Sequence, residues 1–269
     1  MSSTNALEQI ERIVRNHHQN PFEVLGPHAI DKDGKKVWAV RTYLPNADMA
    51  WVVFPEARKE YAMENEQHPQ FFETVLNEDE LANYQIRYKE GPNEHVIYDP
   101  YAFISPVITG FDEHLFAEGH HHRIYEKMGA HPVTIEGVAG VYFAVWAPNA
   151  RNLSVLGDFN NWDGRRHQMR KGPSGIWDLF IPQLTEGAKY KYEVKNNDGH
   201  IYEKADPYGF YREVRPDTSS IVADLDKYQW QDSDWMDHRR QTDQMTQPIS
   251  VYEVHLGAWL HESSAEPAK

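Results

Sequence analysis

The sequence predicts a mainly β protein that consists of two tandem β-sandwiches. Three observations predict this class: a duplicated set of motifs about 103 residues apart, short β-rich segments in both copies, and a length of 269 residues that suffices for two ordinary domains. The duplicated motifs begin at His17 and His120, and continue with Pro-Asn-Ala at 45–47 and 148–150 and Asp-Pro-Tyr-x-Phe at 99–103 and 206–210.

A helix is expected ahead of the first copy. Asn5 and Glu8 have the spacing of the N-cap and N3 residues of a capping box, and the apolar residues between Leu7 and Val14 recur on one helical face. A proline restricts the residue before it to extended conformations, so Asn20-Pro21 is expected to end this helix.

Short β-rich segments alternate with turns in both copies. Tyr190 to Val194 alternates between aromatic or apolar and charged side chains, and Asn197-Asp198-Gly199 supplies the residues that a tight hairpin turn favours. Several short strands separated by turn signals are typical of an immunoglobulin-like β-sandwich, which we therefore predict for each copy. The predicted strands are residues 37–43, 49–54, 71–75, 84–88, 140–146, 153–156, 176–181 and 190–195.

The character of the sequence changes after Asp224. A polar segment that contains Trp230 and Trp235 has the composition of a linker, and Ile249 to Trp259 is a compact apolar segment that predicts a buried strand. Because a buried strand without partner strands is an unusual end for a domain, we expect the chain to be part of a longer protein. The predicted parts are a first sandwich with its helix at 1–108, a second sandwich at 109–226, a linker at 227–248 and a truncated further domain at 249–269.

Composition narrows the class of partner. The net charge of −14 repels phosphate backbones and anionic lipids, so nucleic-acid and membrane partners are not expected, whereas a neutral ligand is not penalised. The absence of cysteine excludes disulfide scaffolds and suits a reducing compartment. The N-terminal residues lack the features of a signal peptide, and no apolar run reaches the ~18 residues of a membrane span, so we expect a cytoplasmic protein.

The second copy contains a polar loop at Gly157–Gly164 that the first copy lacks. Trp162 offers an aromatic face on which a sugar ring can stack. Four polar residues of the loop offer hydrogen-bonding groups for hydroxyls: Asp158, Asn160, Asn161 and Asp163. Lys191 alternates out of the Tyr190–Val194 strand and has a donor for the same purpose. The alternative stays open that this is a structural turn with a packed indole and a solvated lysine, because tryptophan is usually well buried.

The histidine clusters at 17–18 and 120–122 do not predict a metal site. Adjacent histidines do not easily converge on one ion, and no third ligand follows at a matching spacing, so a structural role at the entrance of each domain is expected and no metal is predicted. Carboxylates are plentiful, but no pair has a spacing that singles it out for glycoside chemistry. No cofactor is predicted.

These residues resemble two related families. The run Gly157-Asp158-Phe159-Asn160-Asn161-Trp162, together with Tyr190-Lys191-Tyr192, is similar to the family 48 carbohydrate-binding module, which also occurs in the glycogen-binding subunit of the AMP-activated kinase. The doubled sandwich, the two Asp-Pro-Tyr-x-Phe repeats and the segment from Tyr252 to Trp259 resemble the bacterial glycogen branching enzymes over essentially the whole chain.

The resemblance implies a function for each part. The first sandwich would be an extra N-terminal domain, the second would be the module, and the segment from about Ser250 would be the first strand of a (β/α)8 barrel of the α-amylase superfamily. That family transfers a cut α-1,4-glucan segment to a 6-hydroxyl through a covalent glycosyl-enzyme, with an aspartate nucleophile and a glutamate acid/base that lie beyond this chain. No catalytic residue is therefore expected here, and the chain should bind or orient α-glucan, with Trp162 and Lys191 as contacts, and pack on its own barrel.

One departure and three alternatives remain. The kinase-type module has a second stacking tryptophan after its Asp-Gly turn, where this chain has His200-Ile201, which predicts weaker binding or a docking role for the face. The alternatives are a stand-alone glycan-binding module, the front of a debranching or trehalose-forming hydrolase, and an interaction sandwich without glycan affinity. Since Glu56 to Lys59 of the first copy stand where the second has its loop, the first sandwich is interpreted as a spacer or docking domain.

Overall fold

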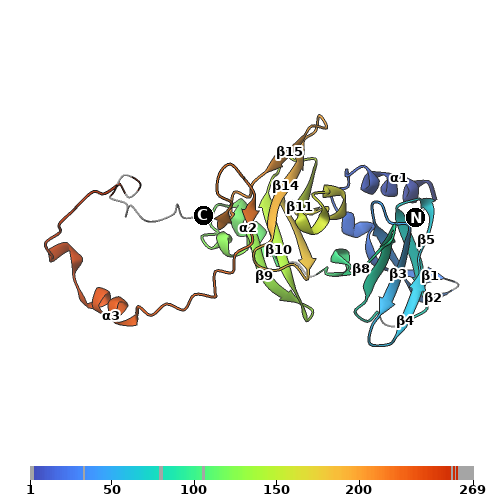
Figure 1. Cartoon of the computed structure of the whole chain (residues 1–269), viewed down its shortest axis with the longest axis horizontal. Coiled ribbons are helices and arrows are strands. Elements are labelled where there is room, and N and C mark those ends of the chain that lie inside the picture. Colours follow the sequence, from blue (N-terminus) through green and yellow to red (C-terminus); the bar gives the residue numbers. More distant parts are fainter. Residues whose placement is uncertain are drawn as a thin grey trace. The chain divides into compact units, whose positions relative to one another are not determined.

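The computed structural model describes residues 3–32, 34–78, 81–104, 107–255, 257 and 259. The chain divides into two compact units, residues 1–224 and residues 225–269. In the first unit, four antiparallel sheets form two successive pairs (Figure 1), which confirms the mainly β class and is consistent with two β-sandwich domains. No helix of the described residues is long and apolar enough to cross a membrane.

The first pair of sheets encloses one apolar core. Its sheets have the strand orders β1-β2-β6-β5 and β4-β3-β7-β8, and Val40, Phe72 and Leu76 of one sheet meet Val52 and Ile86 of the other in a single buried cluster. Alternation along each strand directs these residues inward. The strands are β1 (Gly26–Lys32), β2 (Lys35–Tyr43), β3 (Met49–Phe54), β4 (Lys59–Ala62), β5 (Glu64–His68), β6 (Phe71–Leu76), β7 (Gln85–Glu90) and β8 (Asn93–Tyr98).

The second pair repeats this arrangement. Its sheets have the orders β12-β13-β10-β9 and β11-β14-β17-β16, and β15 pairs with β14 at the side. Trp177 is the largest fully buried side chain, and its indole N–H is bonded to the Ala147 carbonyl at 2.9 Å. The strands are β9 (Gly129–Ile135), β10 (Val138–Trp146), β11 (Asn152–Gly157), β12 (Arg170–Lys171), β13 (Ile176–Pro182), β14 (Lys189–Lys195), β15 (Ile201–Lys204), β16 (Tyr211–Arg212) and β17 (Ser220–Ile221).

The leading helix α1 (Ser3–Val14) begins and ends earlier than the sequence predicted. Asn5 lies inside the helix, so it is not the N-cap, and Pro21 is not what ends it. The end is set by Asn16, whose φ of 53° is left-handed, and by the bonds from the Asn16 and His17 amides to the Ile13 and Arg12 carbonyls. Asparagine adopts this conformation readily, and this pair of bonds is a Schellman ending.

The first unit also contains short helical elements, of which the first lies between α1 and β1 and the others lie between strands. They are η1 (Pro21–Glu23), η2 (Pro100–Ala102), α2 (Gly110–Ala117), η3 (Ile124–Glu126), η4 (Asp158–Asn160) and η5 (Gly164–Arg166). Helix α2 starts with a capping box in which Thr109 and Asp112 exchange hydrogen bonds between side chain and backbone.

The duplicated motifs make the same contacts in both copies. Asp99 caps η2 through the Tyr101 amide and accepts the Tyr84 hydroxyl at 2.7 Å, and Asp206 accepts the Tyr208 amide and the Tyr190 hydroxyl in the same way. Both carboxylates are buried. The Asp-Pro-Tyr repeat is therefore part of the scaffold, because its aspartate satisfies buried donors at the exit of each sandwich.

The histidines that end the first duplicated motif are structural too. His28 Nε2 lies 3.1 Å from the Leu25 carbonyl and His131 Nε2 lies 2.9 Å from the Met128 carbonyl, three residues back in each case. Of the adjacent histidines, His18 is buried and accepts the Asn20 amide at 3.1 Å.

The second unit contains α3 (Ser233–Gln241) and the single turn η6 (Gln244–Thr246). The strand predicted from Ile249 is not formed over residues 249–255, and residues 256, 258 and 260–269 lie outside the described part of the chain. Ile249 and Val251 are 80% and 86% exposed, and among the described residues no strand pairs with this apolar segment. A strand needs a neighbouring strand for its backbone hydrogen bonds, which explains the difference.

Candidate functional site

The 157–164 loop leaves β11 at Gly157 and runs through η4 into η5. Gly157 is fully extended, and a β-carbon at this position would lie 2.2 Å from the Phe159 ring and 2.4 Å from the Lys189 carbonyl oxygen. Both distances are far shorter than van der Waals contact, so only glycine lets the loop fold back this closely on β14.

Two consecutive residues of the loop are left-handed. Asn161 and Trp162 have φ values of 55° and 58°, which is uncommon for residues other than glycine. The Trp162 amide donates to the Gly157 carbonyl at 3.0 Å, and the indole N–H donates to the Asp158 carboxylate at 2.8 Å. These bonds fix the direction of the indole, which is 37% exposed, so its ring is both oriented and accessible.

Lys191 lies beside this indole. Its ammonium is 5.9 Å from the centre of the Trp162 ring and 3.5 Å from the Glu203 carboxylate of the neighbouring strand β15. Tyr190 and Tyr192 are buried on the inner face of β14, so Lys191 points to the outer face, as the alternation predicted. The structure thus brings Trp162 and Lys191 together on one surface.

Asn160 has a different position. It is buried, its carbonyl oxygen accepts the Gly157 amide at 3.0 Å, and its amide nitrogen lies 2.8 Å from the Val155 carbonyl and 2.9 Å from His167 Nδ1. Both polar atoms of this side chain are therefore already hydrogen-bonded within the protein. Asn161, in contrast, is exposed.

His167 follows the loop, is part-buried and is bonded to the side chain of Asn160. We expect this histidine to make the stability of the protein depend on pH. Burial, together with the nearby Arg166 charge, lowers the pKa of His167 from 6.5 to about 3. The unfolded chain binds a proton below pH 6.5 and the folded chain does not, so stability is complete above pH 6.5 and is lost as the pH falls. Between pH 7 and pH 5 this loss amounts to about 2 kcal/mol, measurable by urea unfolding.

The variant His167→Gln isolates this contribution. A glutamine oxygen can accept from Asn160 but does not titrate, so the difference in unfolding free energy between pH 7 and pH 5 should shrink by about 2 kcal/mol. Burial raises the pKa of Asp99 to about 6, which changes stability in the opposite direction, but this effect is present in both proteins and cancels. An unchanged pH dependence would show that His167 titrates normally.

Two residues hold the site in roles that the sequence did not predict. Asp158 orients the indole, and Glu203 holds the Lys191 ammonium. Continuing the strand alternation across the hairpin predicts Glu203, because it pairs with Glu193 and therefore shares its face. By the same pairing Ile201 lies on this face and Tyr202 on the other, so Tyr202 is not a second stacking platform beside Trp162.

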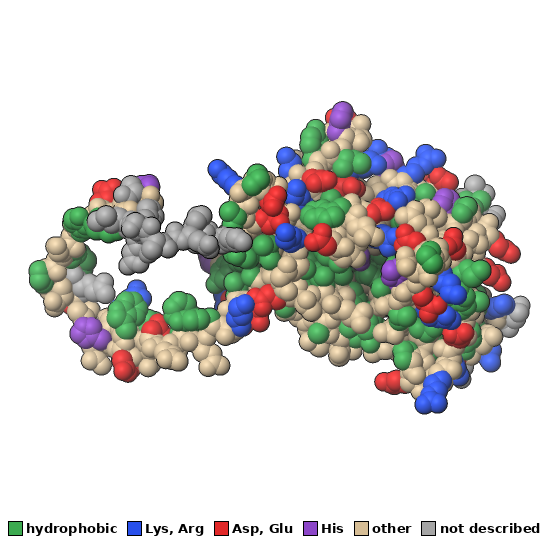
Figure 2. Space-filling view, viewed as in Figure 1, with side chains coloured by type: hydrophobic (Ala, Val, Ile, Leu, Met, Phe, Trp, Pro, Cys, Tyr) green, Lys and Arg blue, Asp and Glu red, His purple; other side chains and the backbone are tan. Residues whose placement is uncertain are grey.

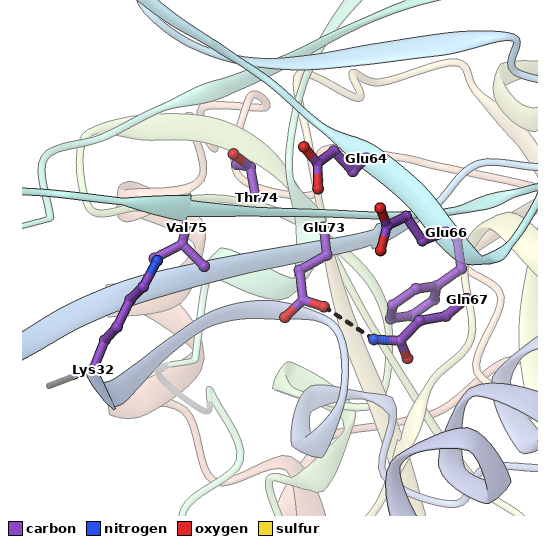
Figure 3. Close-up of a pocket in the computed structure, with 8 residues that line it drawn as sticks. Lys32, Glu64, Glu66, Gln67, Glu73, Thr74 and Val75 are labelled. Atoms are coloured by element: carbon purple, nitrogen blue, oxygen red, sulfur yellow. Dashed lines mark hydrogen bonds between the residues drawn. The ribbon is translucent and has the colours of Figure 1, made fainter. Parts of the chain in front are cut away.

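The hollow in Figure 3 lies on the first sandwich and has a different character. Glu64 and Glu66 of β5 and Glu73 of β6 line it, and Gln67 donates to Glu73 at 3.5 Å. It has carboxylates but no exposed aromatic face. Within the part of the chain that the structure describes, no group of three or more acidic or histidine side chains is placed to hold a metal ion.

The charged side chains next to the indole are of both signs, because Asp158 bonds the indole N–H and Glu203 lies beside Lys191. Acidic and basic side chains are interspersed over the visible face of the first unit (Figure 2). An exposed, fixed indole with a lysine beside it and mixed charges around it suits a neutral ligand that combines an apolar face with hydroxyl groups.

Comparison with known proteins assigns the two sandwiches. Residues 6–101 match the N-terminal domain of the alpha-1,4-glucan branching enzyme GlgB, and residues 127–209 match carbohydrate-binding module 48, the isoamylase N-terminal domain. The chain is 64% identical to the 1,4-alpha-glucan branching enzyme GlgB of Trichormus variabilis over 99% of its own length and 35% of that protein. It is also 64% identical to the GlgB of Thermosynechococcus vestitus, over 97% of the chain and 34% of that protein.

Structural similarity is weaker. A pullulanase from Anoxybacillus sp. LM18-11 aligns with a TM-score of 0.32 at 18% identity, over 72% of this chain and 27% of that one, which supports no further conclusion. The chain spans about a third of the length of the curated relatives it matches. With a GlgB N-terminal domain at 6–101 and a family 48 module at 127–209, the chain belongs to the 1,4-alpha-glucan branching enzymes GlgB and corresponds to their N-terminal portion.

Proposed function

We propose that this chain binds and orients α-1,4-glucan for a branching enzyme that transfers a cut α-1,4-glucan segment to a 6-hydroxyl, and that it does so without catalysis. The observation that carries the proposal is the outward, fixed indole of Trp162 with Lys191 beside it. A glucose ring stacks its apolar face on the indole, and the lysine donates to a ring hydroxyl.

The four predicted contacts have different roles in this proposal. Trp162 and Lys191 touch the glucan, and the exposed Asn161 supplies a further hydrogen bond. Asn160 acts through the loop rather than on the ligand, because its side chain is already bonded to Val155, Gly157 and His167. The aromatic platform that lies beside Lys191 is the single indole of Trp162, which predicts modest affinity for a single chain and stronger retention on a polymer with many chains.

The catalytic centre belongs, in this proposal, to a (β/α)8 barrel of which residues 249–269 are the start, preceded by a linker at 227–248. The exposure of Ile249 and Val251 supports this, because an apolar segment that resembles a core strand requires a partner to cover it. The sandwiches, at 1–108 and 109–226, pack on that barrel, and the cysteine-free composition supports a cytoplasmic location.

Replacement of Trp162 by alanine tests the binding role. Loss of the stacking face should weaken binding of the chain to glycogen at least tenfold, which corresponds to about 1.4 kcal/mol. The measurement is co-sedimentation of the chain with glycogen over a range of glycogen concentrations.

Trp146→Ala is the matched control. Trp146 is 52% exposed at the end of β10, and its indole N–H is likewise fixed, by the Ser174 carbonyl at 3.1 Å, but it lies in the other sheet. It should leave retention unchanged. Equal, weak retention of the wild-type chain and Trp162→Ala would leave Trp162 with a packing role only and would refute glucan binding at this loop.

A further inference from the structure

Arg166, two residues past the 157–164 loop, connects the module to the first sandwich. Its guanidinium donates to the Tyr88 hydroxyl and to the Pro45 carbonyl, both at 3.1 Å, and to the Glu90 carboxylate at 3.2 Å. All three acceptors belong to the first sandwich, and the arginine side chain is only 13% exposed. A planar guanidinium that meets three acceptors in a buried setting fixes geometry rather than merely neutralising charge.

The residues after Arg166 add further bonds between the module and the first sandwich, and we call this set of contacts, made by residues 165–168, the seam. The Gln168 amide donates to the Tyr101 hydroxyl at 3.0 Å, and that hydroxyl donates to the Gln168 carbonyl at 3.2 Å. The Gln168 side chain donates to the Ile13 carbonyl at the end of α1, at 2.9 Å, and to the Arg165 carbonyl at 3.2 Å. The Arg165–Gln168 segment is therefore held by helix α1, by strand β7, by the loop after β2 and by η2.

This seam is bonded directly to the loop that carries Trp162. The Arg166 amide donates to the Asp163 carbonyl at 3.2 Å, and the Asp163 carboxylate accepts the Arg165 amide at 3.0 Å and its guanidinium at 2.9 and 2.7 Å. Asp163 follows immediately after the left-handed pair Asn161 and Trp162. Two consecutive left-handed residues persist only where surrounding contacts hold them in place. On the C-terminal side of this pair, those contacts are the bonds of Asp163 to Arg165 and Arg166.

We propose that the first sandwich is the positioning domain of the glucan site: through Arg166 it holds the 157–164 loop in the conformation that presents Trp162 to the ligand. Arg166 touches no glucan and acts through Asp163 and the backbone. The first sandwich has no such loop of its own, and this proposal gives it a role in the affinity of the second sandwich for glucan. The proposal rests on the proposed function for its ligand, but not for its structural part.

The test uses the whole chain and two readouts. In Arg166→Ala, hydrogen exchange of the loop amides should be at least tenfold faster, and the Trp162 indole N–H resonance should shift, both measured without glucan. Binding to glycogen should weaken three- to tenfold. Arg166→Lys, which keeps the charge but reaches fewer acceptors, should give intermediate values for all three quantities.

Variants in the first sandwich test whether the effects of Arg166→Ala arise merely because the substitution unfolds the module. Tyr88→Phe combined with Glu90→Ala removes two acceptors from strand β7, far from the loop in sequence, and should reproduce the faster loop exchange. Arg170→Ala is the matched control, because Arg170 also spans the two sandwiches, through the Ile104 carbonyl at 3.0 Å and the Phe22 ring at 4.8 Å, but is not bonded to the loop.

The outcomes separate the two proposals. Loop exchange that is unchanged in Arg166→Ala and in the Tyr88/Glu90 variant, or that rises equally in Arg170→Ala, would overturn the positioning role. A wild-type chain that does not bind glycogen, with loop exchange that still depends on Arg166, would refute the ligand and keep the positioning role. Faster exchange together with unchanged glycogen affinity would overturn the effect of the first sandwich on binding.

Discussion

Replacement of Asp206 by alanine is expected to destabilise the second sandwich by about 3 kcal/mol or more. The buried carboxylate accepts the Tyr190 hydroxyl at 2.7 Å, the Tyr192 hydroxyl at 3.1 Å and the Tyr208 amide at 2.8 Å. Alanine leaves all three donors without this acceptor where water does not replace it, and each such loss costs about 1 kcal/mol or more. The midpoint of urea unfolding measures the effect.

The first sandwich supplies the control. Asp99 occupies the equivalent position but accepts only the Tyr84 hydroxyl and the Tyr101 amide, so Asp99→Ala should cost less than Asp206→Ala. Asp206→Asn keeps one acceptor oxygen and the shape of the side chain, and should fall between alanine and the wild type. If Asp206→Ala costs less than about 1 kcal/mol, the repeated Asp-Pro-Tyr motif does not stabilise the scaffold through its carboxylate.

The repeats made the scaffold predictable because each one encodes a local contact. His28 and His131 bond a carbonyl three residues back, and Asp99 and Asp206 bond an amide two residues on, so a motif that recurs carries its own structure with it. The alternation of Tyr190 to Val194 likewise predicted which side chains face the core. The end of helix α1 was predicted less well, because the left-handed Asn16 ends it before Pro21 does.

The candidate site was predictable in part. The Gly-bounded polar loop made Trp162 a candidate contact but left open whether its indole is packed or accessible, whereas strand alternation directed Lys191 outward. The burial of Asn160 was not predictable, because it depends on acceptors at Val155 and His167 that the loop geometry brings together. The contacts of Arg166 could not be predicted from the sequence either, because its partners lie 76 to 121 residues away and no periodic pattern connects them.

The apolar segment from Ile249 is a case in which the local sequence predicted a strand that is not formed. Its composition predicts a core strand, yet residues 249–255 form none. A strand at the centre of a sheet obtains both its hydrogen bonds and its burial from neighbours, so the same sequence without those neighbours stays exposed. Helix α1 differs because its hydrogen bonds are internal and its apolar residues Ile10 and Ile13 are buried in a core cluster of the first unit.

The conformation of the 157–164 loop depends on the absence of a side chain at Gly157. A β-carbon on Gly157 would meet the Lys189 carbonyl at 2.4 Å and the Phe159 ring at 2.2 Å. The ring can rotate away, but the carbonyl belongs to β14, where Lys189 pairs with Ile221 of β17, and it cannot move without disturbing that pairing. Relief must therefore come from the loop itself, which would lose the bond from the Trp162 amide to the Gly157 carbonyl and with it the left-handed pair.

Gly157→Ala is accordingly expected to reduce glycogen binding by more than tenfold and to lower the unfolding free energy by about 2 kcal/mol. Gly140→Ala is the matched control, because a β-carbon there would meet the Ile181 carbonyl at 2.5 Å in the other sheet. It should cost similar stability while the folded protein keeps its affinity for glycogen, measured by co-sedimentation below the unfolding temperature of both variants. Retained affinity in Gly157→Ala would mean that glucan is bound elsewhere, because a loop displaced from β14 cannot keep the indole of Trp162 beside Lys191.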